Sequence, residues 1–263
     1  MALADQDGSS LVRLVQIMQR LLAPDGCPWD REQTLETLRP YVVEEAHEVV
    51  DAIDSGSPSE LREELGDLLL QIVFQSELAR AKGWFGPDDV VAAICDKLVR
   101  RHPHVFGEQK VSGVGEVLAN WEAIKAEEKA GRGVLDGVPK ALPALLRASR
   151  VGEKAARVGF DWPDRAGARA KVDEELAELD AAIASGDAKA IEHELGDVLF
   201  ALVSVARKTD VDPEAALRGT LERFSERVRG VERIAQERGL SLSQLDSAAL
   251  DALWHEVKAG LGK

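Results

Sequence analysis

The chain has 263 residues, enough for one large domain or two small ones, and its 33 Lys and Arg against 47 Asp and Glu give a net charge of −14 at pH 7. That charge disfavours nucleic acids and anionic membranes as partners and favours a divalent cation. Two cysteines cannot form a disulfide framework, no apolar run suits a bilayer, and the first residues, MALADQDGSS, lack a secretory pattern, so we expect a cytoplasmic protein without a membrane partner.

The predicted elements are all helices. Aromatic residues make up only 5% of the chain, which is dominated by the helix-favouring residues Ala, Leu, Glu, Arg and Lys. Apolar spacing and helix-breaking residues predict five helices in the first half, at 9–22, 34–55, 58–82, 87–101 and 114–128. Five more are predicted in the second half, at 143–158, 165–185, 187–208, 212–238 and 241–259. No strand is expected, so the fold class is all-α.

The two sets of helices resemble copies of one module. The segment Glu44–Glu48 is echoed by Glu174–Glu178, and Glu64–Asp67 is echoed by Glu194–Asp197 at the same offset along the chain. An internal duplication accounts for both matches. We therefore expect an N-terminal module over residues 1–125, a linker over 126–142 and a C-terminal module over 143–263. Features present in both halves are the better functional candidates.

Each half places carboxylates on two neighbouring helices. Glu45 and Glu48 are three residues apart and share a helix face, and Glu64 and Asp67 repeat that spacing on the next helix. A short Ser-Gly turn joins the two helices, so an antiparallel hairpin is expected to bring four carboxylates together. Such an oxygen cluster suits Mg²⁺, with Mn²⁺ as a substitute. The predicted metal ligands are Glu45, Glu48, Glu64, Asp67, Glu175, Glu178, Glu194 and Asp197.

Asp67 and Asp197 are each set into an otherwise apolar helical run. A helix that is apolar nearly all round is buried, so both aspartates are expected in or beside the core, where an ionised carboxylate needs a metal or a partner. A single Glu-x-x-Glu is more often a solvated helix face, but an aspartate embedded in this way twice favours a metal site. The adjacent Gly66 and Gly196 indicate either close approach of a helix or ligand, or tolerated packing glycines.

Basic residues and tryptophans also recur in the two halves, and they are candidates for nucleotide contacts. Arginine and lysine bind phosphate oxygens, and tryptophan stacks on bases. The alternatives are cations that favour a helix C-terminus and tryptophans that pack in a core. No P-loop or Rossmann glycine pattern occurs. The predicted nucleotide-binding residues are Lys97, Arg101, Trp121, Lys125, Arg223, Arg227, Trp254 and Lys258.

These motifs resemble the MazG family of nucleotide pyrophosphohydrolases, whose signature is Glu-Glu-x-x-Glu followed by Glu-x-x-Asp. The segments Gly26–Asp30, Asp96–Phe106 and Gly159–Trp162 also look like the two-domain bacterial members. The resemblance implies tandem four-helix modules, usually in a homodimer, that hydrolyse NTPs or dNTPs to the nucleoside monophosphate and pyrophosphate with Mg²⁺. It implies the eight metal ligands above and nucleotide contacts at Arg223, Arg227, Trp254 and Lys258. The sequence departs from the family in Arg223, where Lys is common, and in His193, where an acidic residue is common.

The predicted mechanism is in-line attack by water on a metal-held phosphate, with Glu44 or Glu174 as the catalytic residue that orients the water. One alternative is a di-iron carboxylate site, because Glu44 and His47 have Glu-x-x-His spacing. The copy has Ala177 in place of that histidine. Another alternative is a non-enzymatic helical scaffold, which leaves the repeated embedded aspartates unexplained. The expected partners are an NTP substrate and a second copy of the chain.

Overall fold

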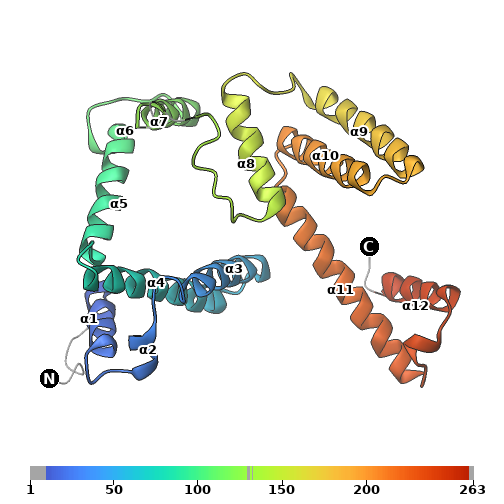
Figure 1. The fold of residues 1–263 in the computed structure, drawn as a ribbon, viewed down its shortest axis with the longest axis horizontal. Helices are drawn as coiled ribbons and strands as arrows, with labels where there is room; N and C mark the ends of the chain where they lie inside the picture. Colours follow the sequence, from blue (N-terminus) through green and yellow to red (C-terminus); the bar gives the residue numbers. More distant parts are fainter. Residues whose placement is uncertain (1–9, 129–130, 132, 261–263) are drawn as a thin grey trace. The chain divides into compact units, whose positions relative to one another are not determined.

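The computed structural model describes residues 10–128, 131 and 133–260 (Figure 1). Across these residues the chain forms twelve α-helices, one short 3₁₀ helix and no strand, so the predicted all-α fold is confirmed. The chain divides into two compact units, residues 1–130 and residues 131–263. None of the described helices combines the length and the apolar character that a membrane span requires.

The described residues of the first unit form the helices α1 (Leu11–Leu22), α2 (Pro28–Glu32), α3 (Arg39–Ser55), α4 (Pro58–Ala81), α5 (Pro87–Arg101), α6 (Pro103–Phe106) and α7 (Val114–Glu128). Helices α3 and α4 pack along each other as a hairpin, and α1 packs on α4. Gly56 ends α3 in the left-handed region at φ 69°, which glycine adopts without strain. The Ser57 hydroxyl then accepts a hydrogen bond from the backbone N–H of Glu60 at 3.4 Å and caps α4.

The described residues of the second unit form α8 (Ala144–Arg157), α9 (Arg165–Ser185), α10 (Ala188–Lys208), α11 (Pro213–Glu237), the 3₁₀ helix η2 (Leu242–Gln244) and α12 (Ser247–Gly260). Helices α9 and α10 lie side by side as a second hairpin (Figure 1), and α8 packs on α10. Gly186 at φ 71° and Asp187, which accepts from the backbone N–H of Lys189 at 3.0 Å, repeat the turn of the first unit. The turn in each hairpin thus sets how its two helices align along each other.

Two predicted helices differ in extent from those observed. The helix expected from residue 34 begins at Arg39, because Thr34 and Thr37 exchange hydrogen bonds between backbone N–H and side-chain oxygen at 2.8 and 3.2 Å and hold a turn. The helix expected over 241–259 is divided into η2 and α12, because Asp246 accepts from the backbone N–H of Ala249 at 2.8 Å and caps a new helix. The short helices α2 and α6 lie where loops were expected.

The cores of the two units are small, and large apolar faces stay exposed. In the first unit Met18, Leu38, Val73 and Phe74 form a buried cluster, and in the second a cluster forms between α11 and α12. The exposed apolar residues of α4 and α10 include Leu65, Leu69, Ile72, Leu195, Leu199, Phe200 and Leu202. The apolar runs that predicted burial are therefore left uncovered by the other described helices of their own unit.

This exposure corrects one expectation. Asp67 is exposed and the Asp197 side chain is 43% exposed, so neither aspartate lies in a core of the chain. The expectation was wrong because an apolar helical run shows that a face needs covering, without showing whether the same chain covers it.

Candidate functional site

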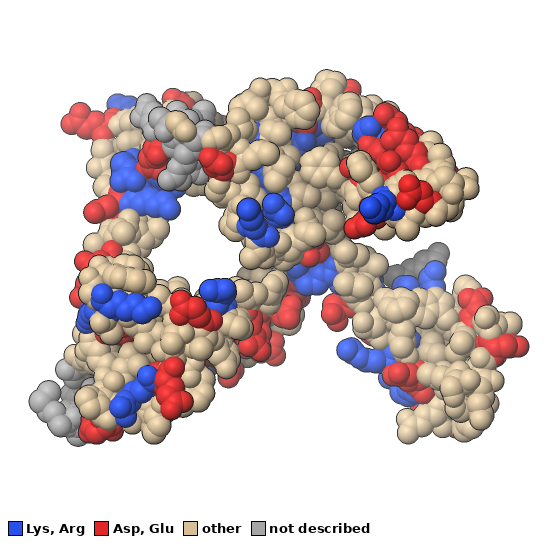
Figure 2. Space-filling view, viewed as in Figure 1, with Lys and Arg blue, Asp and Glu red and all other residues tan. Residues whose placement is uncertain are grey.

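Both hairpins bring predicted metal ligands together. In the first unit Glu45 and Glu48 from α3 and Glu64 from α4 have carboxylate oxygens within 4.8 Å of one another. The second unit repeats this triad with two glutamates of α9 and one of α10: Glu175, Glu178 and Glu194. Figure 2 shows acidic side chains gathered over α9. Six of the eight predicted ligands thus form two triads with the same geometry.

Crowding perturbs the first triad. Loss of solvent raises the pKa of Glu45 above its usual value, and the negative charges of Asp67 and Glu48 raise it further. The pKa of Glu64 is raised for the same reasons, with desolvation first, then Glu48 and Asp67. Asp67 therefore acts on the triad electrostatically although it is exposed. Several like charges without a neutralising cation are the environment that a divalent metal relieves.

Gln71 is a residue that the sequence analysis missed. It lies on α4, is buried, and forms a side-chain hydrogen bond with Glu45 that partly offsets the rise in the pKa of that glutamate. Its amide oxygen has no hydrogen-bond partner. The signal was present in the sequence, because Gln71 is one of the few polar residues in an apolar run, but the run gave no indication of what it contacts.

Lys171 neutralises part of the second triad. Its Nζ lies 2.7 Å from Glu174 Oε1 and 2.8 Å from Glu175 Oε1, and hydrogen bonds to these two carboxylates raise the pKa of the lysine. Glu175 is the most buried of the triad, with its side chain 8% exposed. Desolvation and the charges of Glu175 and Glu194 still raise the pKa of Glu178. Lys171 was missed because a lysine three or four residues before a glutamate is common on charged helices and does not by itself indicate a site.

The predicted catalytic glutamates differ in their surroundings. Glu174 is held by Lys171, whereas Glu44 is exposed on α3. His47, which suggested a di-iron site, belongs to none of the metal-capable groups found among the described residues. His193 forms a further group with Glu194 and Asp197, and its Nδ1 lies 2.8 Å from Asp197 Oδ2. The unusual histidine of the second half is thus placed beside the carboxylates.

The basic and aromatic candidates form matching pairs in the two units. The Arg101 guanidinium lies 5.9 Å from the ring centroid of Trp121, and that of Arg227 lies 5.7 Å from Trp254. Phe224 packs on Trp254 with ring centroids 5.3 Å apart. In the first unit α5 and α7 supply the pair, and in the second α11 and α12 supply it.

These pairs stand apart from the carboxylate triads in the described structure. Arg101 and Arg100 instead bind Glu128, and these two arginines lower the pKa of Glu128 to about 2. Arg223 donates to the Thr220 hydroxyl at 2.9 Å. Lys97 and Lys258 are exposed, and the side chain of Lys125 lies outside the described residues. The contacts described for Arg101, Arg223 and Arg227 are therefore with groups other than the predicted metal ligands.

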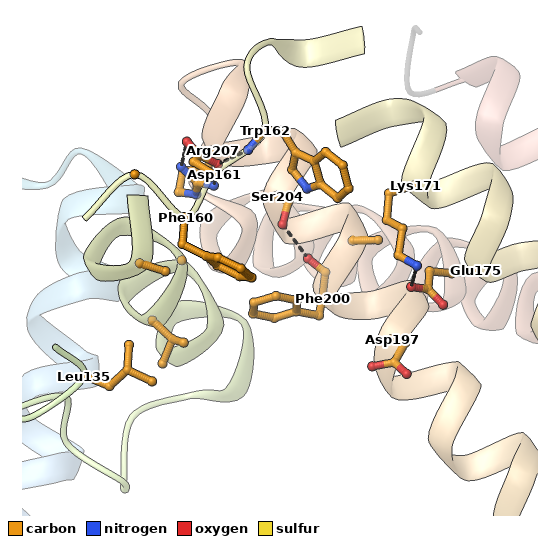
Figure 3. Close-up of a pocket in the computed structure, with 15 residues that line it drawn as sticks. Leu135, Phe160, Asp161, Trp162, Lys171, Glu175, Asp197, Phe200, Ser204 and Arg207 are labelled. Atoms are coloured by element: carbon orange, nitrogen blue, oxygen red, sulfur yellow. Dashed lines mark hydrogen bonds and ion pairs between the residues drawn. The ribbon is translucent and has the colours of Figure 1, made fainter. Parts of the chain in front are cut away.

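A cavity of about 510 Å³ opens beside the second triad. Its lining includes the predicted ligands Glu175 and Asp197, together with the aromatic rings of Phe160, Trp162 and Phe200 (Figure 3). Gly159–Trp162 matches a family pattern in the sequence, but its spacing does not reveal a cavity, because the residues that complete the walls come from α8 and α10.

Comparison with known proteins identifies the family. The family model described as the MazG nucleotide pyrophosphohydrolase domain matches residues 33–106 and 167–231, which contain both triads. The chain belongs to the MazG family. As a MazG protein it is a hydrolase that acts on phosphoric anhydride bonds, and its all-α fold holds two MazG matches in tandem.

Relatives extend the MazG likeness over nearly the whole chain. A protein of Escherichia coli K12 named nucleoside triphosphate pyrophosphohydrolase is 46% identical over 252 residues, covering 94% of this chain and 96% of its own. A protein of Thermotoga maritima named nucleoside triphosphate pyrophosphohydrolase/pyrophosphatase MazG is 43% identical, covering 94% and 95%. Bacillus subtilis YabN, named as uncharacterized, is 43% identical over 92% of this chain and 50% of its own length.

Proposed function

We propose that the protein hydrolyses NTPs and dNTPs to the nucleoside monophosphate and pyrophosphate, and that it requires Mg²⁺, with Mn²⁺ as a substitute. The observation that carries this proposal is the crowded carboxylate triad, present twice, in a MazG chain with full-length relatives named nucleoside triphosphate pyrophosphohydrolases. Closely spaced carboxylate oxygens suit Mg²⁺. The proposed ligands are Glu45, Glu48, Glu64 and Asp67 in the first half and Glu175, Glu178, Glu194 and Asp197 in the second.

The residues of the second half support a specific division of roles. When bound, Mg²⁺ supplies positive charge that offsets the charge on the phosphate oxygens. Glu174 orients the attacking water and accepts its proton, and Lys171, 2.7 Å away, holds Glu174 in place. Water adds to the α-phosphorus, the bond from that phosphorus to the bridging oxygen breaks, and pyrophosphate leaves with the bonding electrons. Glu44 has the corresponding role in the first half.

The proposed site is completed by a second copy of the chain. The exposed apolar face of α4 and α10 needs a cover, and the Arg227–Trp254 pair, with Arg223 and Lys258, is separate from the triad of its own chain. A homodimer that buries these faces can bring the basic residues of one copy to the triad of the other. Lys97, Arg101, Trp121 and Lys125 are the proposed counterparts in the first half.

Three further expectations remain proposals. The proposed modules are residues 1–125 and 143–263 with a linker over 126–142, and the division between the two compact units falls within that linker. The net charge of −14 supports a protein without a nucleic acid partner. The same charge and the lack of a membrane-spanning helix among those described are compatible with the cytoplasmic location that we propose.

The test is a hydrolysis assay in H₂¹⁸O across NTPs and dNTPs, with Mg²⁺, Mn²⁺ or a chelator, in which phosphate and pyrophosphate are resolved. We expect pyrophosphate as the released product, the ¹⁸O label in the monophosphate, and no turnover with the chelator. Release of inorganic phosphate with a diphosphate product, or label in pyrophosphate, contradicts the proposed bond cleavage. Turnover that persists with the chelator contradicts the role of the triads.

A further inference from the structure

The second carboxylate site has a histidine at its edge. His193 lies on α10, one residue before the triad residue Glu194 and one helical turn before Asp197. These three residues form a metal-capable group, because one donor atom from each lies within 4.8 Å of the others. Glu194 belongs both to this group and to the triad, so the two groups share one carboxylate. The second site can therefore offer an ion a nitrogen donor as well as oxygen donors.

The contact between His193 and Asp197 has the spacing of two donors on one metal ion. His193 Nδ1 lies 2.8 Å from Asp197 Oδ2 and 3.8 Å from Glu194 Oε1. Two donors that are each about 2.1 Å from an ion, at right angles to each other, are about 3 Å apart. Residues i and i+4 share one face of a helix, which is how the two histidines of a His-Glu-x-x-His helix bind one metal. An ion can thus bind here without a change in α10.

The group is open to solvent on the side of the histidine. The exposed fraction of the side chain falls from 71% for His193 to 43% for Asp197 and 22% for Glu194. An ion bound here can keep water ligands on its exposed side, while the less exposed Glu194 links it to the triad. Because the His193 ring is not packed in a core, it can turn towards an ion without disturbing the fold.

The first half lacks this nitrogen donor. The offset that relates the two triads places Glu63 opposite His193 and Asp67 opposite Asp197. Glu63 is exposed and belongs to none of the metal-capable groups found among the described residues. Its negative charge is one of those that raise the pKa of Glu64. The first site therefore has carboxylates at both positions, and the two halves differ in the kind of ion that their donors suit.

The donor set decides the class of ion. Carboxylate, carbonyl and water oxygens suit Mg²⁺, whereas imidazole nitrogen suits first-row transition metals such as Fe²⁺, Ni²⁺, Cu²⁺ and Zn²⁺. For a site with nitrogen and oxygen donors, affinity rises along that series from Mn²⁺ through Co²⁺ to Cu²⁺. A position with one imidazole and two carboxylates thus favours a transition metal ion over Mg²⁺.

We propose that His193, Glu194 and Asp197 hold a first-row transition metal ion at the edge of the second carboxylate site, and that His193 selects this ion over Mg²⁺. The proposal rests on the proposed function in one respect, because the adjoining triad is taken to hold Mg²⁺. An ion at this position adds positive charge beside the triad, where the substrate phosphates are proposed to bind. The first half, with Glu63 in place of the histidine, has no such position.

The test measures binding of Co²⁺ and of Mg²⁺ by calorimetry, without nucleotide, and binding of Co²⁺ in a large excess of Mg²⁺. Co²⁺ also gives a direct readout, because the ring N–H proton of a histidine bound to it is shifted far outside the normal range of proton NMR. The variants are His193→Gln, which removes the imidazole without adding charge, and His193→Glu, which copies the first half.

His255→Gln is the control for these variants. His255 Nε2 lies 3.4 Å from Asp251 Oδ2, one helical turn away on α12, and its side chain is about as exposed as that of His193. It belongs to no metal-capable group in the described part of the chain. Since both histidines pair with an aspartate, a loss caused only by breaking a surface ion pair would appear in the control as well.

The unchanged protein should bind Co²⁺ that excess Mg²⁺ does not displace, and should show the shifted proton. Both His193 variants should lose that proton and lower the ratio of Co²⁺ to Mg²⁺ affinity at least about tenfold, whereas the control should change neither. An unchanged ratio, or a shifted proton that persists in His193→Gln, overturns the proposal and leaves the His193–Asp197 contact as an ion pair only. Circular dichroism confirms folding, which an exposed side chain should not disturb.

Failure of this metal position and failure of the proposed function give different results. If the unchanged protein hydrolyses NTPs with Mg²⁺ but its ratio of Co²⁺ to Mg²⁺ affinity does not depend on His193, only the transition metal position is wrong. If the His193 variants lose Co²⁺ selectively but the unchanged protein hydrolyses no NTP, the metal position exists and the proposed reaction is wrong.

Discussion

The two halves share a carboxylate triad on a helical hairpin and an arginine–tryptophan pair, and they differ in other side chains around the triad. In the first half Arg101 binds Glu128 and contacts Trp121, and the position that matches Ser204 holds Phe74, which is buried in the core. In the second half Arg227 contacts Trp254, and Ser204 lines the cavity. Both halves thus have the carboxylate triad, and the cavity lies beside the second one.

The neutralisation of the triads differs as well. Lys171 pairs with Glu175 in the second half, and the corresponding residue of the first half is Tyr41, which packs edge-on to Trp29 with ring centroids 6.3 Å apart. The first triad therefore lacks the neutralising lysine of the second, and a cation bound there would offset more uncompensated charge. We infer that both halves hold metal and that the second half carries most of the turnover.

The largest expected effect comes from removing one proposed metal ligand in each half. Glu175→Gln should lower kcat for NTP hydrolysis by about a hundredfold or more, because even groups that only support metal ligands contribute 10- to 100-fold. Glu45→Gln, the matched change, should leave kcat within about twofold. Steady-state assays of both variants, with circular dichroism to confirm folding, make the measurement. Equal losses in the two variants would show that both halves turn over substrate.

A smaller effect is expected from breaking ion pairs that differ between the halves, namely those of Asp161 in the second half and of Glu77 in the first. Asp161→Asn leaves Arg207 and Lys208, both largely buried, without a carboxylate, and should lower the free energy of unfolding by about 2 kcal/mol. Glu77→Gln should cost about 1 kcal/mol, because glutamine keeps a hydrogen bond to Gln19 and Arg80 is more exposed. Denaturant unfolding of both variants measures the difference.

The effect of Asp161 also has a defined pH dependence. Hydrogen bonds from Arg207 hold the pKa of Asp161 well below its usual 3.8. A depressed carboxyl pKa adds stability above the unfolded-state pKa, and that stability is lost as the pH falls below it. The gap in unfolding free energy between the unchanged protein and Asp161→Asn should be full at pH 7 and shrink below about pH 4. A gap that stays constant into acid contradicts the ion-pair account.

The sequence predicted the features that depend on residues close together in the chain. The three-residue separation of Glu45 and Glu48 and the Ser-Gly turn were enough to predict a hairpin with converging carboxylates. It did not predict the contact of Asp161 with Arg207, because 46 residues separate the two and only the packing of α8 on α10 brings them together. Burial of Asp67 was predicted wrongly, since a repeated apolar face does not reveal whether its cover is the same chain or another.

A further prediction tests that cover directly, at the glycines of the two hairpins. Gly66 and Gly196 lie within α4 and α10, and a Cβ added to either would meet nothing within 4 Å in the chain. In an isolated chain, alanine at either position should raise the free energy of unfolding by about 0.5–1 kcal/mol through helix propensity. If a second copy packs closely there, the added methyl group instead costs about 1–3 kcal/mol of association.

We expect the second outcome for Gly196→Ala and for Gly66→Ala, because both lie on the exposed apolar faces that a homodimer would bury. Sedimentation equilibrium should show weaker association, and the melting temperature at a fixed protein concentration should fall. A higher melting temperature with unchanged mass would mean that nothing approaches the glycines. If only one of the two variants weakens association, the dimer interface lies at that half. The two hairpins would then differ in what covers them, although their sequence patterns are alike.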